Sequence, residues 1–384
     1  MEKFEVTILG CGSALPTMKH MNSSQIVNMR NKLFMIDCGE GTQLTLRRNS
    51  VNFNRITTIF LSHLHGDHCL GLTGMVSTLG LLGRTAPLHI YGPSDTEKVF
   101  RPHIDYFCPN IGYEVHFHSI DTTTHSLVYE DRSVEVYSIP LKHRVACCGF
   151  LFREKSGLRH ILDYMIERHE IPYSHINNIK KGLDYVTPSG ERISNEELTT
   201  PPDPVRSYAY CSDTKYDEDI IPYIKDVDLL YHEATYADDR QDLAEKYNHS
   251  TARQAASIAK AANARKLVIG HYSQRYNDET LLLNEAREVF KETYLSVEEM
   301  VKSPTPPENP SGLPLGNGLT VTKIFGVVSV FLISTYVEPR LKNASKGSMA
   351  SVALATDASK RADSISNCPA CCGNNTNWRY IVER

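Results

Sequence analysis

Short apolar runs recur through the first three-quarters of the chain, and each ends at a polar or glycine-rich turn. Residues 4–9 (FEVTIL) alternate apolar and polar positions and include β-branched side chains, so they predict a β-strand. Runs of the same kind predict strands at residues 33–36, 56–61, 88–91, 134–139, 207–211, 229–231 and 266–269. Residues 251–262 and 280–293 instead favour helices. Strands interspersed with helices predict an α/β protein built in layers.

The segment between the strands at 134–139 and 207–211 has a different character. Residues 158–169 predict a helix, but prolines then interrupt the chain repeatedly. We interpret residues 153–206 as an insertion that projects from the core. A long surface loop with its own small hairpin would have the same pattern without a function.

The chain changes again from about residue 296. Residues 303–315 are rich in proline and glycine and predict a linker, and the remainder predicts a poorly ordered tail. The apolar run at 324–337 is shorter than the about 20 residues that span a bilayer, so we expect no membrane segment. The cysteines of 368–372 (CPACC) would suit metal or redox chemistry, but no second Cys/His pair lies nearby. We therefore expect a domain at 1–295 and an appended tail at 296–384.

Composition limits the class of protein. The chain has 384 residues, of which 22% are charged and 41% hydrophobic, which is typical of a globular protein with a sizeable core. The formal net charge is −4, so nucleic-acid binding would depend on local basic patches and on metal charge. The cysteines do not form a regular framework and the N-terminus does not resemble a signal peptide. Both observations predict a cytoplasmic protein with reduced thiols.

Residues 63–68 (HLHGDH) gather three imidazoles and a carboxylate directly after the predicted strand at 56–61. His63 and His65 lie two apart, so extended backbone projects them to one side. Asp67 and His68 follow where the chain must turn. Imidazole nitrogen and carboxylate oxygen are ligands that Zn²⁺ accepts. Packing does not explain the pattern, because burying an unpaired Asp among histidines is costly.

Three further candidate ligands follow three other predicted strands. His143 comes after 134–139, Asp213 after 207–211, and His271 after 266–269. A lone His or Asp after a strand is usually an ordinary loop residue. The repeated context, added to residues 63–68, predicts a site for two metal ions.

His249 is set apart from these ligands. It precedes Ser250, which we expect to be the N-cap of the helix at 251–262. A helix N-terminus disfavours an imidazolium unless a carboxylate compensates, and Glu233 is such a carboxylate. The remaining histidines lack a strand-end context, and we interpret them as surface or packing residues: His20, His89, His103, His116, His118, His125, His160, His169 and His175.

With these motifs together, the chain resembles the metallo-β-lactamase superfamily and, within it, the short form of the ribonuclease Z family. The segment 62–68 (SHLHGDH) is similar to the superfamily signature. The resemblance extends over about residues 1–295 through the segments 10–17 (GCGSALPT), 37–43 (DCGEGTQ), 140–145 (PLKHRV), 210–214 (YCSDT), 232–235 (HEAT), 249–252 (HSTA) and 270–276 (GHYSQRY). The HEAT and HSTA segments point to the tRNA-processing branch.

The resemblance implies an αβ/βα four-layer sandwich that holds two Zn²⁺ ions per subunit at one edge. One ion would be bound by His63, His65 and His143, and the other by Asp67, His68 and His271, with Asp213 bridging them. The insertion at 153–206 occupies the place of the arm with which this family grips tRNA. Its segment 171–178 (IPYSHINN) stands where the family arm usually has a Gly-Pro-rich tip, and the tail at 296–384 has no counterpart in the family.

The activity that the resemblance implies is cleavage of the 3′ trailer from precursor tRNA, which leaves a 3′-hydroxyl on the tRNA. Asp67 would bind metal and orient the attacking water, and His249, positioned by Glu233, would protonate the leaving oxygen or stabilise the phosphorane. The candidates for phosphate contacts are Arg144, Lys180, Lys181 and Arg275. The family tends to form homodimers, so we expect one here.

Alternative functions keep the same fold. A phosphodiesterase or esterase for a smaller substrate would use the same metals, but the Glu233/His249 pair and the arm argue against it. A redox di-iron protein usually has Glu where His65 stands. A non-catalytic nucleic-acid-binding relative would have lost ligands that this chain keeps.

One alternative has a different fold. The GCG segment at 10–12 resembles the start of a dinucleotide-binding loop, but Leu15 and Pro16 then break the pattern.

Overall fold

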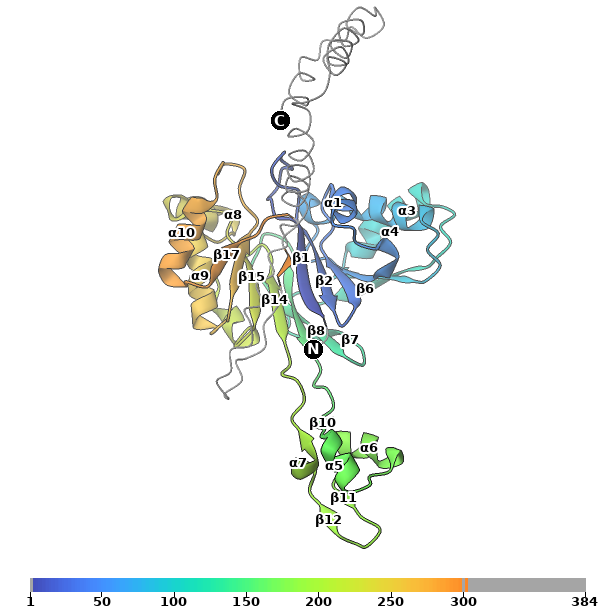
Figure 1. Cartoon of the computed structure of the whole chain (residues 1–384). Helices are drawn as coiled ribbons and strands as arrows, with labels where there is room; N and C mark the ends of the chain where they lie inside the picture. The colour runs from blue at the N-terminus through green and yellow to red at the C-terminus, as the bar shows by residue number, and fades with distance from the viewer. Residues whose placement is uncertain (1–2, 299–300, 303–384) are drawn as a thin grey trace, which may run out of the picture. The chain divides into compact units, whose positions relative to one another are not determined.

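The computed structural model describes residues 3–298 and 301–302, and they contain two seven-stranded sheets packed face to face (Figure 1). The first sheet has the order β18-β1-β2-β3-β4-β5-β6, with strands β1 (Phe4–Gly10), β2 (Ser24–Met29), β3 (Lys32–Ile36), β4 (Ile56–Phe60), β5 (Leu88–Pro93), β6 (Val115–Ile120) and β18 (Val301–Lys302). The second has the order β17-β16-β15-β14-β9-β8-β7, with β7 (Leu127–Glu130), β8 (Val134–Pro140), β9 (Cys148–Glu154), β14 (Ser207–Cys211), β15 (Leu229–Glu233), β16 (Leu267–Gly270) and β17 (Thr293–Leu295).

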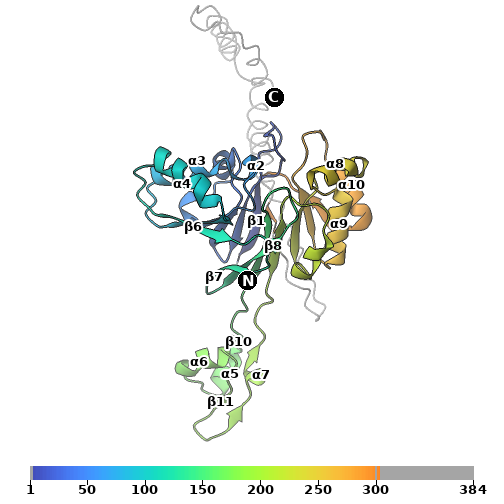
Figure 2. The same cartoon turned by 180° about the vertical axis from the view of Figure 1, so that it is seen from behind.

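Helices cover the outer face of each sheet (Figure 2). The first sheet is covered by α1 (Thr42–Arg48), α3 (Leu72–Leu81) and α4 (Thr96–Phe107), and the second by α8 (Gln241–Tyr247), α9 (Ala252–Ala261) and α10 (Thr280–Val289). The apolar side chains of the first set pack with the outer face of their sheet in one hydrophobic cluster. The fold is therefore the predicted αβ/βα sandwich of four layers.

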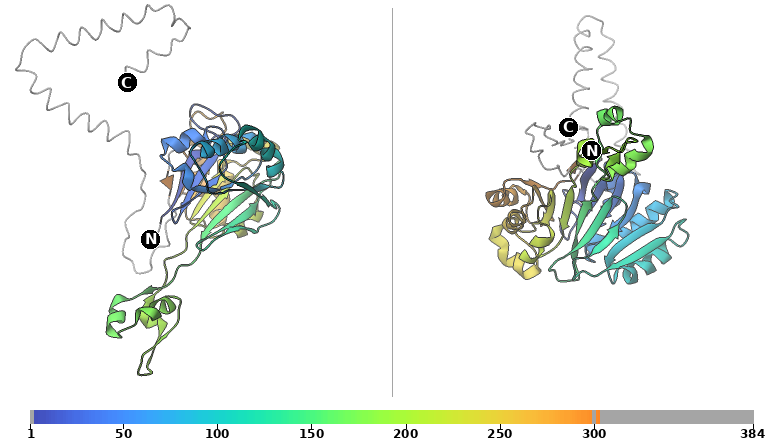
Figure 3. Two further views of the ribbon diagram at one scale, coloured as in Figure 1. Left: turned by 90° about the vertical axis from the view of Figure 1, so that its right-hand side faces the viewer. Right: turned by 90° about the horizontal axis from the view of Figure 1, so that it is seen from below.

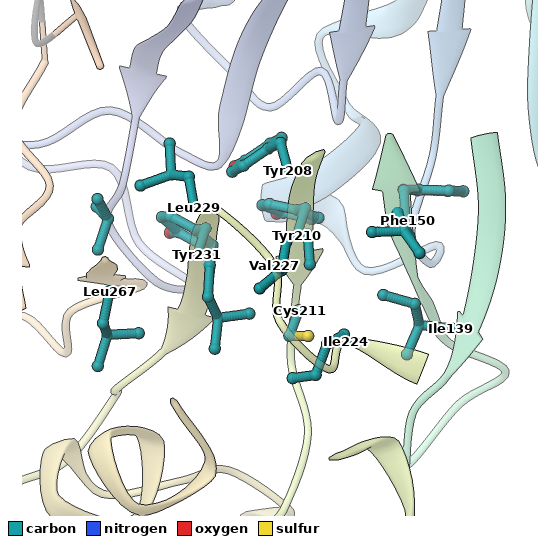
Figure 4. Close-up of a cluster of buried hydrophobic side chains, with 14 of the residues drawn as sticks. Ile139, Phe150, Tyr208, Tyr210, Cys211, Ile224, Val227, Leu229, Tyr231 and Leu267 are labelled. Carbon is teal, nitrogen blue, oxygen red and sulfur yellow. The ribbon is translucent and has the colours of Figure 1, made fainter. Parts of the chain in front are cut away.

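The main core lies between the two sheets, because alternate strand residues point inward from both. In β1, Phe4, Val6 and Ile8 are buried while the residues between them are partly exposed. Figure 4 shows buried side chains on both faces of the second sheet, among which the rings of Tyr210 and Tyr231 stack at 5.0 Å.

Strands β3 to β6 are parallel, and so are β14 to β17. The carboxyl ends of parallel neighbours meet at one edge of a sheet, so the loops that leave them are brought together. This arrangement positions the candidate metal ligands.

The segment between β9 and β14 forms a small body with its own core (Figure 3). It contains β10 (His160–Ile161), α5 (Asp163–Arg168), α6 (Tyr173–Lys180), β11 (Tyr185–Val186), β12 (Arg192–Ile193), α7 (Asn195–Leu198) and β13 (Thr199–Thr200). Its buried side chains form a cluster separate from the sandwich: Met165, Ile171, Ile179, Tyr185, Ile193 and Leu198. At the base of this segment, which we name the arm, the Arg206 guanidinium donates to both oxygens of Glu154, at 2.7 and 2.8 Å.

Three expectations about helices were wrong. Only Asp163–Arg168 is helical within 158–169, because Ile161 pairs with Thr199 in a short antiparallel ladder. The helix predicted at 280–293 ends at Val289, since Phe290 is extended and Thr293 begins β17. The N-cap of α9 is Thr251 rather than Ser250, and Thr251 forms a capping box with Gln254.

The remaining strand predictions agree with the structure to within two residues at each end. After residue 295 the chain adds β18, which pairs with β1 in antiparallel fashion. The predicted linker at 303–315, the apolar run at 324–337 and the cysteines of 368–372 lie outside the described residues. Among the described residues, no helix has the length and apolar composition needed to cross a lipid bilayer.

Candidate metal centre

All seven side chains predicted as ligands meet where strand ends converge. His63, His65, Asp67 and His68 lie in the loop after β4 and in the short helix α2 (Gly66–Cys69) that follows it. The others follow strands of the second sheet: His143 after β8, Asp213 after β14 and His271 after β16. His63 and His68 are fully buried, and Asp213 is 2% exposed. The side chains form two groups of donors.

The first group contains His63, His65, His143 and Asp213. Nδ1 of His65 lies 3.1 Å from Nε2 of His63 and 3.2 Å from Nε2 of His143. Oδ2 of Asp213 lies 3.6 Å from Nε2 of His63 and 3.7 Å from Nε2 of His143. Burial, reinforced by the nearby His68, lowers the pKa of His63 well below its ordinary value. Burial likewise lowers the pKa of His65 and of His143, which keeps the imidazoles in the neutral form that binds metal.

The second group contains Asp67, His68, His271 and the other oxygen of Asp213. Nε2 of His68 lies 3.3 Å from Nε2 of His271 and 3.6 Å from Oδ2 of Asp67. Oδ1 of Asp213 lies 3.3 Å from Nε2 of His68 and 3.2 Å from Nε2 of His271. Burial alone would lower the pKa of His68, but the carboxylates of Asp213 and Asp67 outweigh it and raise that pKa. The carboxylates therefore favour a positive charge here, which a bound cation would supply.

The spacing of the donors fits two metal ions that share Asp213. Ligands held at 2.0–2.1 Å around a tetrahedral ion such as zinc are separated by about 3.3 Å. The distances between donors within each group cluster around that value, and Asp213 offers one oxygen to each group. The alternative interpretation is that the imidazoles only form hydrogen bonds with one another. Such hydrogen bonds would not require that the lone pairs of several nitrogen and oxygen atoms point to one place.

Neighbouring groups orient the histidines through their other ring nitrogens. Nδ1 of His68 contacts Oδ2 of Asp37 at 2.8 Å, and Nδ1 of His271 contacts Oγ1 of Thr235 at 2.9 Å. Nδ1 of His143 donates to the carbonyl of Asn248 at 2.9 Å, and Nδ1 of His63 contacts Oγ of Ser62 at 3.0 Å. Such contacts set the tautomer and direction of a metal-binding histidine.

Asp37 is the functional residue that the sequence analysis missed. It is fully buried after β3, and its carboxylate accepts bonds from the Ser62 amide at 2.8 Å and the Tyr210 hydroxyl at 2.7 Å, besides contacting His68. The available signal was its position directly after a predicted strand, which is also the context of Asp213.

His249 lies beside both groups without being needed to complete either. Its ring centroid is 5.1 Å from that of His143 and 5.4 Å from that of His271. Nδ1 of His249 lies 2.8 Å from Oε1 of Glu233, as the sequence led us to expect. Glu233 is fully buried and is fixed by the amides of Thr214 and Thr235, at 3.0 and 3.1 Å.

The charge state of His249 follows from these contacts. Burial alone would lower the pKa of His249, but the carboxylate of Glu233 outweighs it and raises this pKa to about 9. The imidazolium therefore persists at neutral pH beside the candidate metal ligands.

The four predicted phosphate contacts fall into two places. Arg144 and Arg275 are exposed next to the centre, one residue after His143 and four after His271, and the Arg144 guanidinium lies over the ring of Tyr247 at 5.9 Å. Lys180 and Lys181 lie in the arm, at the end of α6 and just after it, so they do not belong to the same cluster.

Comparison with known proteins gives the family. A family model, the anti-Pycsar protein Apyc1, matches residues 4–102. Ribonuclease Z of Bacteroides thetaiotaomicron is 55% identical over 300 residues, which cover 78% of this chain and 95% of that protein. Ribonuclease Z of Parabacteroides distasonis is 54% identical, covering 78% and 99%.

Solved structures show the same fold. The human short-form tRNase Z has a TM-score of 0.57 at 24% identity, covering 78% of this chain and 99% of that one. A metallo-β-lactamase fold protein from Bacillus subtilis has a TM-score of 0.55 at 19% identity, covering 78% and 98%. At such identities the likeness concerns the fold alone, whereas the sequence relatives are far closer. The chain has the metallo-β-lactamase fold and belongs to the ribonuclease Z family.

Proposed function

We propose that this protein is a metal-dependent endoribonuclease that removes the 3′ trailer from precursor tRNA and leaves a 3′-hydroxyl on the tRNA. The observation that carries the proposal is the pair of donor groups joined by Asp213, in a chain about half identical to ribonuclease Z over nearly the whole length of those relatives. Membership of the family supplies the class of substrate.

The proposed cofactor is a pair of zinc ions in each subunit. His63, His65 and His143 would hold one ion, Asp67, His68 and His271 the other, and Asp213 would bridge them. Two such ions, when bound, lower the pKa of a shared water and neutralise charge on a phosphate.

The remaining roles belong to side chains of the chain itself. Asp67 orients the attacking water or accepts its proton, since its carboxylate is more accessible than the imidazole of His68. His249 protonates the leaving 3′ oxygen or stabilises the negative charge that develops on the phosphoryl oxygens. Glu233 keeps His249 charged and fixes the direction of its ring, so we regard it as a positioning residue.

The arm and the exposed cations would bind the body of the substrate. Arg144 and Arg275 lie near the centre, where they would contact phosphates that flank the scissile bond, and Lys180 and Lys181 would contact the tRNA through the arm. We propose a nuclease domain with an arm at 153–206, and since β18 (Val301–Lys302) pairs with β1, the domain extends beyond residue 295. A homodimer and a cytoplasmic location remain parts of the proposal.

A metallo-β-lactamase fold phosphodiesterase or esterase for a smaller substrate is the second candidate. The observations that favour the nuclease are the Glu233/His249 pair and an arm with a core of its own, neither of which a small substrate requires.

The decisive experiment combines metal analysis with mapping of the cut. The purified protein should contain about two zinc ions per chain and should cut a precursor tRNA at the 3′ end of the mature tRNA, leaving a hydroxyl. Efficient hydrolysis of a simple phosphodiester, with no cleavage of the precursor, would favour the second candidate instead.

A further inference from the structure

The loop between β1 and β2, residues 11–23, contacts the candidate metal centre at one end. The Ala14 amide donates to Oδ2 of Asp67 at 2.7 Å. The Ser13 amide donates to the carbonyl of Tyr272 at 3.0 Å, and the Tyr272 amide donates to the carbonyl of Cys11 at 3.0 Å. Tyr272 directly follows His271. This loop, which we name the β1–β2 loop, therefore touches one candidate ligand and the neighbour of another.

Ala14 is held in an unfavourable backbone conformation. Its φ is 51°, in the left-handed region that side chains other than glycine rarely adopt. Such a conformation persists only where the surrounding structure determines it.

His20 anchors the far end of the loop between two carboxylates from the end of the domain. Its Nδ1 lies 2.9 Å from Oε2 of Glu298, and its Nε2 lies 3.1 Å from Oε1 of Glu279. Glu298 also accepts the Met21 amide at 2.8 Å through its other oxygen. His20 is 6% exposed, so these contacts are shielded from water. The sequence context of His20, which follows no predicted strand, gives no sign of these contacts.

The charges in this cluster balance when His20 is an imidazolium. Glu279 and Glu298 each contribute a carboxylate, and Lys19 forms an ion pair with Glu279. Burial alone would lower the pKa of His20, but the bonds to Glu298 and Glu279 outweigh it and raise that pKa. Both ring nitrogens then act as donors to carboxylates, and no charge is buried without a partner.

A bound cation is the competing interpretation of the same cluster. The donor atoms of Cys11, His20 and Glu298 lie within 4.8 Å of one another. However, each already has a hydrogen-bond partner: the Cys11 thiol lies 3.6 Å from the carbonyl of Ser296, and His20 is paired on both sides. In the centre at Asp213, several acceptor atoms face one another without donors between them. In this cluster the acceptors are already paired with donors.

We propose that Glu298, Glu279 and His20 act as positioning residues that hold the β1–β2 loop so that the Ala14 amide fixes the carboxylate of Asp67. A bond to one oxygen of a ligating carboxylate sets its direction, and loss of such partners typically weakens metal binding or activity 10- to 100-fold. This inference rests on the proposed role of Asp67 as a metal ligand. It makes the end of the domain, near residue 298, part of the machinery that orients the site.

The test measures zinc affinity by competition with a chelator, in the full-length protein, for Glu298→Gln and for His20→Asn. One of the two zinc ions should bind about tenfold or more weakly, while the other keeps its affinity. The kcat for precursor tRNA should fall with KM within about twofold, because substrate contacts are unchanged. Hydrogen exchange of the amides of the β1–β2 loop should speed up in the metal-free variants. Glu292→Gln, which changes an exposed carboxylate that accepts from Tyr294, is the matched control and should alter none of these.

Two results would overturn the inference. If both variants only lowered the melting temperature, with both zinc affinities and kcat unchanged, the cluster would be a structural ion pair. If the wild-type chain bound a third ion that Cys11→Ser removed, the cluster would be a metal site. Failure of the wild-type protein to bind two ions or to cut precursor tRNA is a separate result, which would count against the proposed function itself.

Discussion

At the scale of single residues, Asp213 determines how the two halves of the centre are related. Its two oxygens face different groups of histidines at 3.2–3.7 Å, and burial, which would raise the pKa of Asp213, is outweighed by the surrounding imidazoles of His271, His68 and His63. One carboxylate thus belongs to both donor groups. A neutral side chain of similar shape at this position would remove negative charge from both groups at once.

His249 gives the sharpest prediction at this scale. His249→Ala should keep both metal ions and lose about 10²-fold or more in kcat. Because Glu233 raises the pKa of His249 to about 9, the imidazolium is present below that pH and is lost above it. The wild-type rate should therefore fall as pH rises through about 9, and this limb should be missing from the variant's pH profile.

The control for that prediction is His65→Ala, which should lose metal and activity together. Equal metal loss in both variants would make His249 a ligand, and full activity in His249→Ala would remove it from the mechanism.

The candidate ligands could be found from the sequence because each follows a short apolar run, and strand ends converge in a parallel sheet. Asp37 has the same context, but it lies in the glycine-rich segment 37–43, and nothing in the sequence distinguishes it from an ordinary turn residue. The partner of His143 is the backbone carbonyl of Asn248, which has no signature in the sequence. Contacts made through backbone atoms, including the Ala14 amide on Asp67, required the structure.

At the scale of elements, the arm shows where local pattern fails. Its helices are short and its strands have two residues each, so pairing between distant segments decides the conformation. Residues 160–161 are therefore extended although their neighbours favour a helix. Eight strands of the sandwich, which have a buried face along their length, were predicted closely for the opposite reason, whereas β2, β6, β7, β9, β17 and β18 were not predicted.

The ion pair at the base of the arm should make stability depend on pH. Burial alone would raise the pKa of Glu154, but Arg206 outweighs it and lowers this pKa below the ordinary value of 4.5. The contribution of this ion pair to the free energy of unfolding is therefore complete above the ordinary pKa of 4.5. It is lost as pH falls through the lower pKa that Glu154 has in the folded protein. Glu154→Gln should reduce the free energy of unfolding by about 3 kcal/mol at pH 7, since it leaves Arg206 buried without its partner carboxylate.

The matched control is Glu130→Gln, which breaks the more exposed pair with Lys155 and should reduce the free energy of unfolding much less. Denaturant titrations at pH 7 and pH 3 would measure both. Equal losses in the two variants would contradict the role given to Glu154.

The arm itself should matter for large substrates only. Replacing residues 157–205 by a short flexible linker should raise KM for precursor tRNA about 10²-fold, because a second point of attachment is lost. Hydrolysis of a small phosphodiester should not change.

The milder double variant Lys180→Ala/Lys181→Ala should bind precursor tRNA with a weaker dependence on salt. The slope of log affinity against log salt concentration should fall in magnitude by about two, one for each lost phosphate contact. Unchanged affinity after deletion of the arm would exclude it as a binding element.

At the scale of the whole molecule, the candidate ligands come from both sheets. His63, His65, Asp67 and His68 follow a strand of the first sheet, whereas His143, Asp213 and His271 follow strands of the second. Bound ions would therefore link the two halves of the sandwich directly.

Removing the ions should destabilise the fold as well as abolish activity. At a free zinc concentration 100-fold above the dissociation constant, each ion adds about 2.7 kcal/mol to the free energy of unfolding. Thermal melts before and after treatment with a chelator should show a clear drop in melting temperature that added zinc reverses. An unchanged melting temperature would show that the two sheets are held together without the ions.

The hydroxyl of Tyr210 has a consequence for how this protein tolerates change. Its ring packs in the interior between the sheets, yet its oxygen reaches Asp37, which in turn contacts His68. A substitution such as Tyr210→Phe, which preserves volume and apolar packing, would still withdraw a donor from that buried acid. The interior packing is thus coupled to the candidate metal centre, and a redesign guided by packing alone would remove a contact that helps to orient His68.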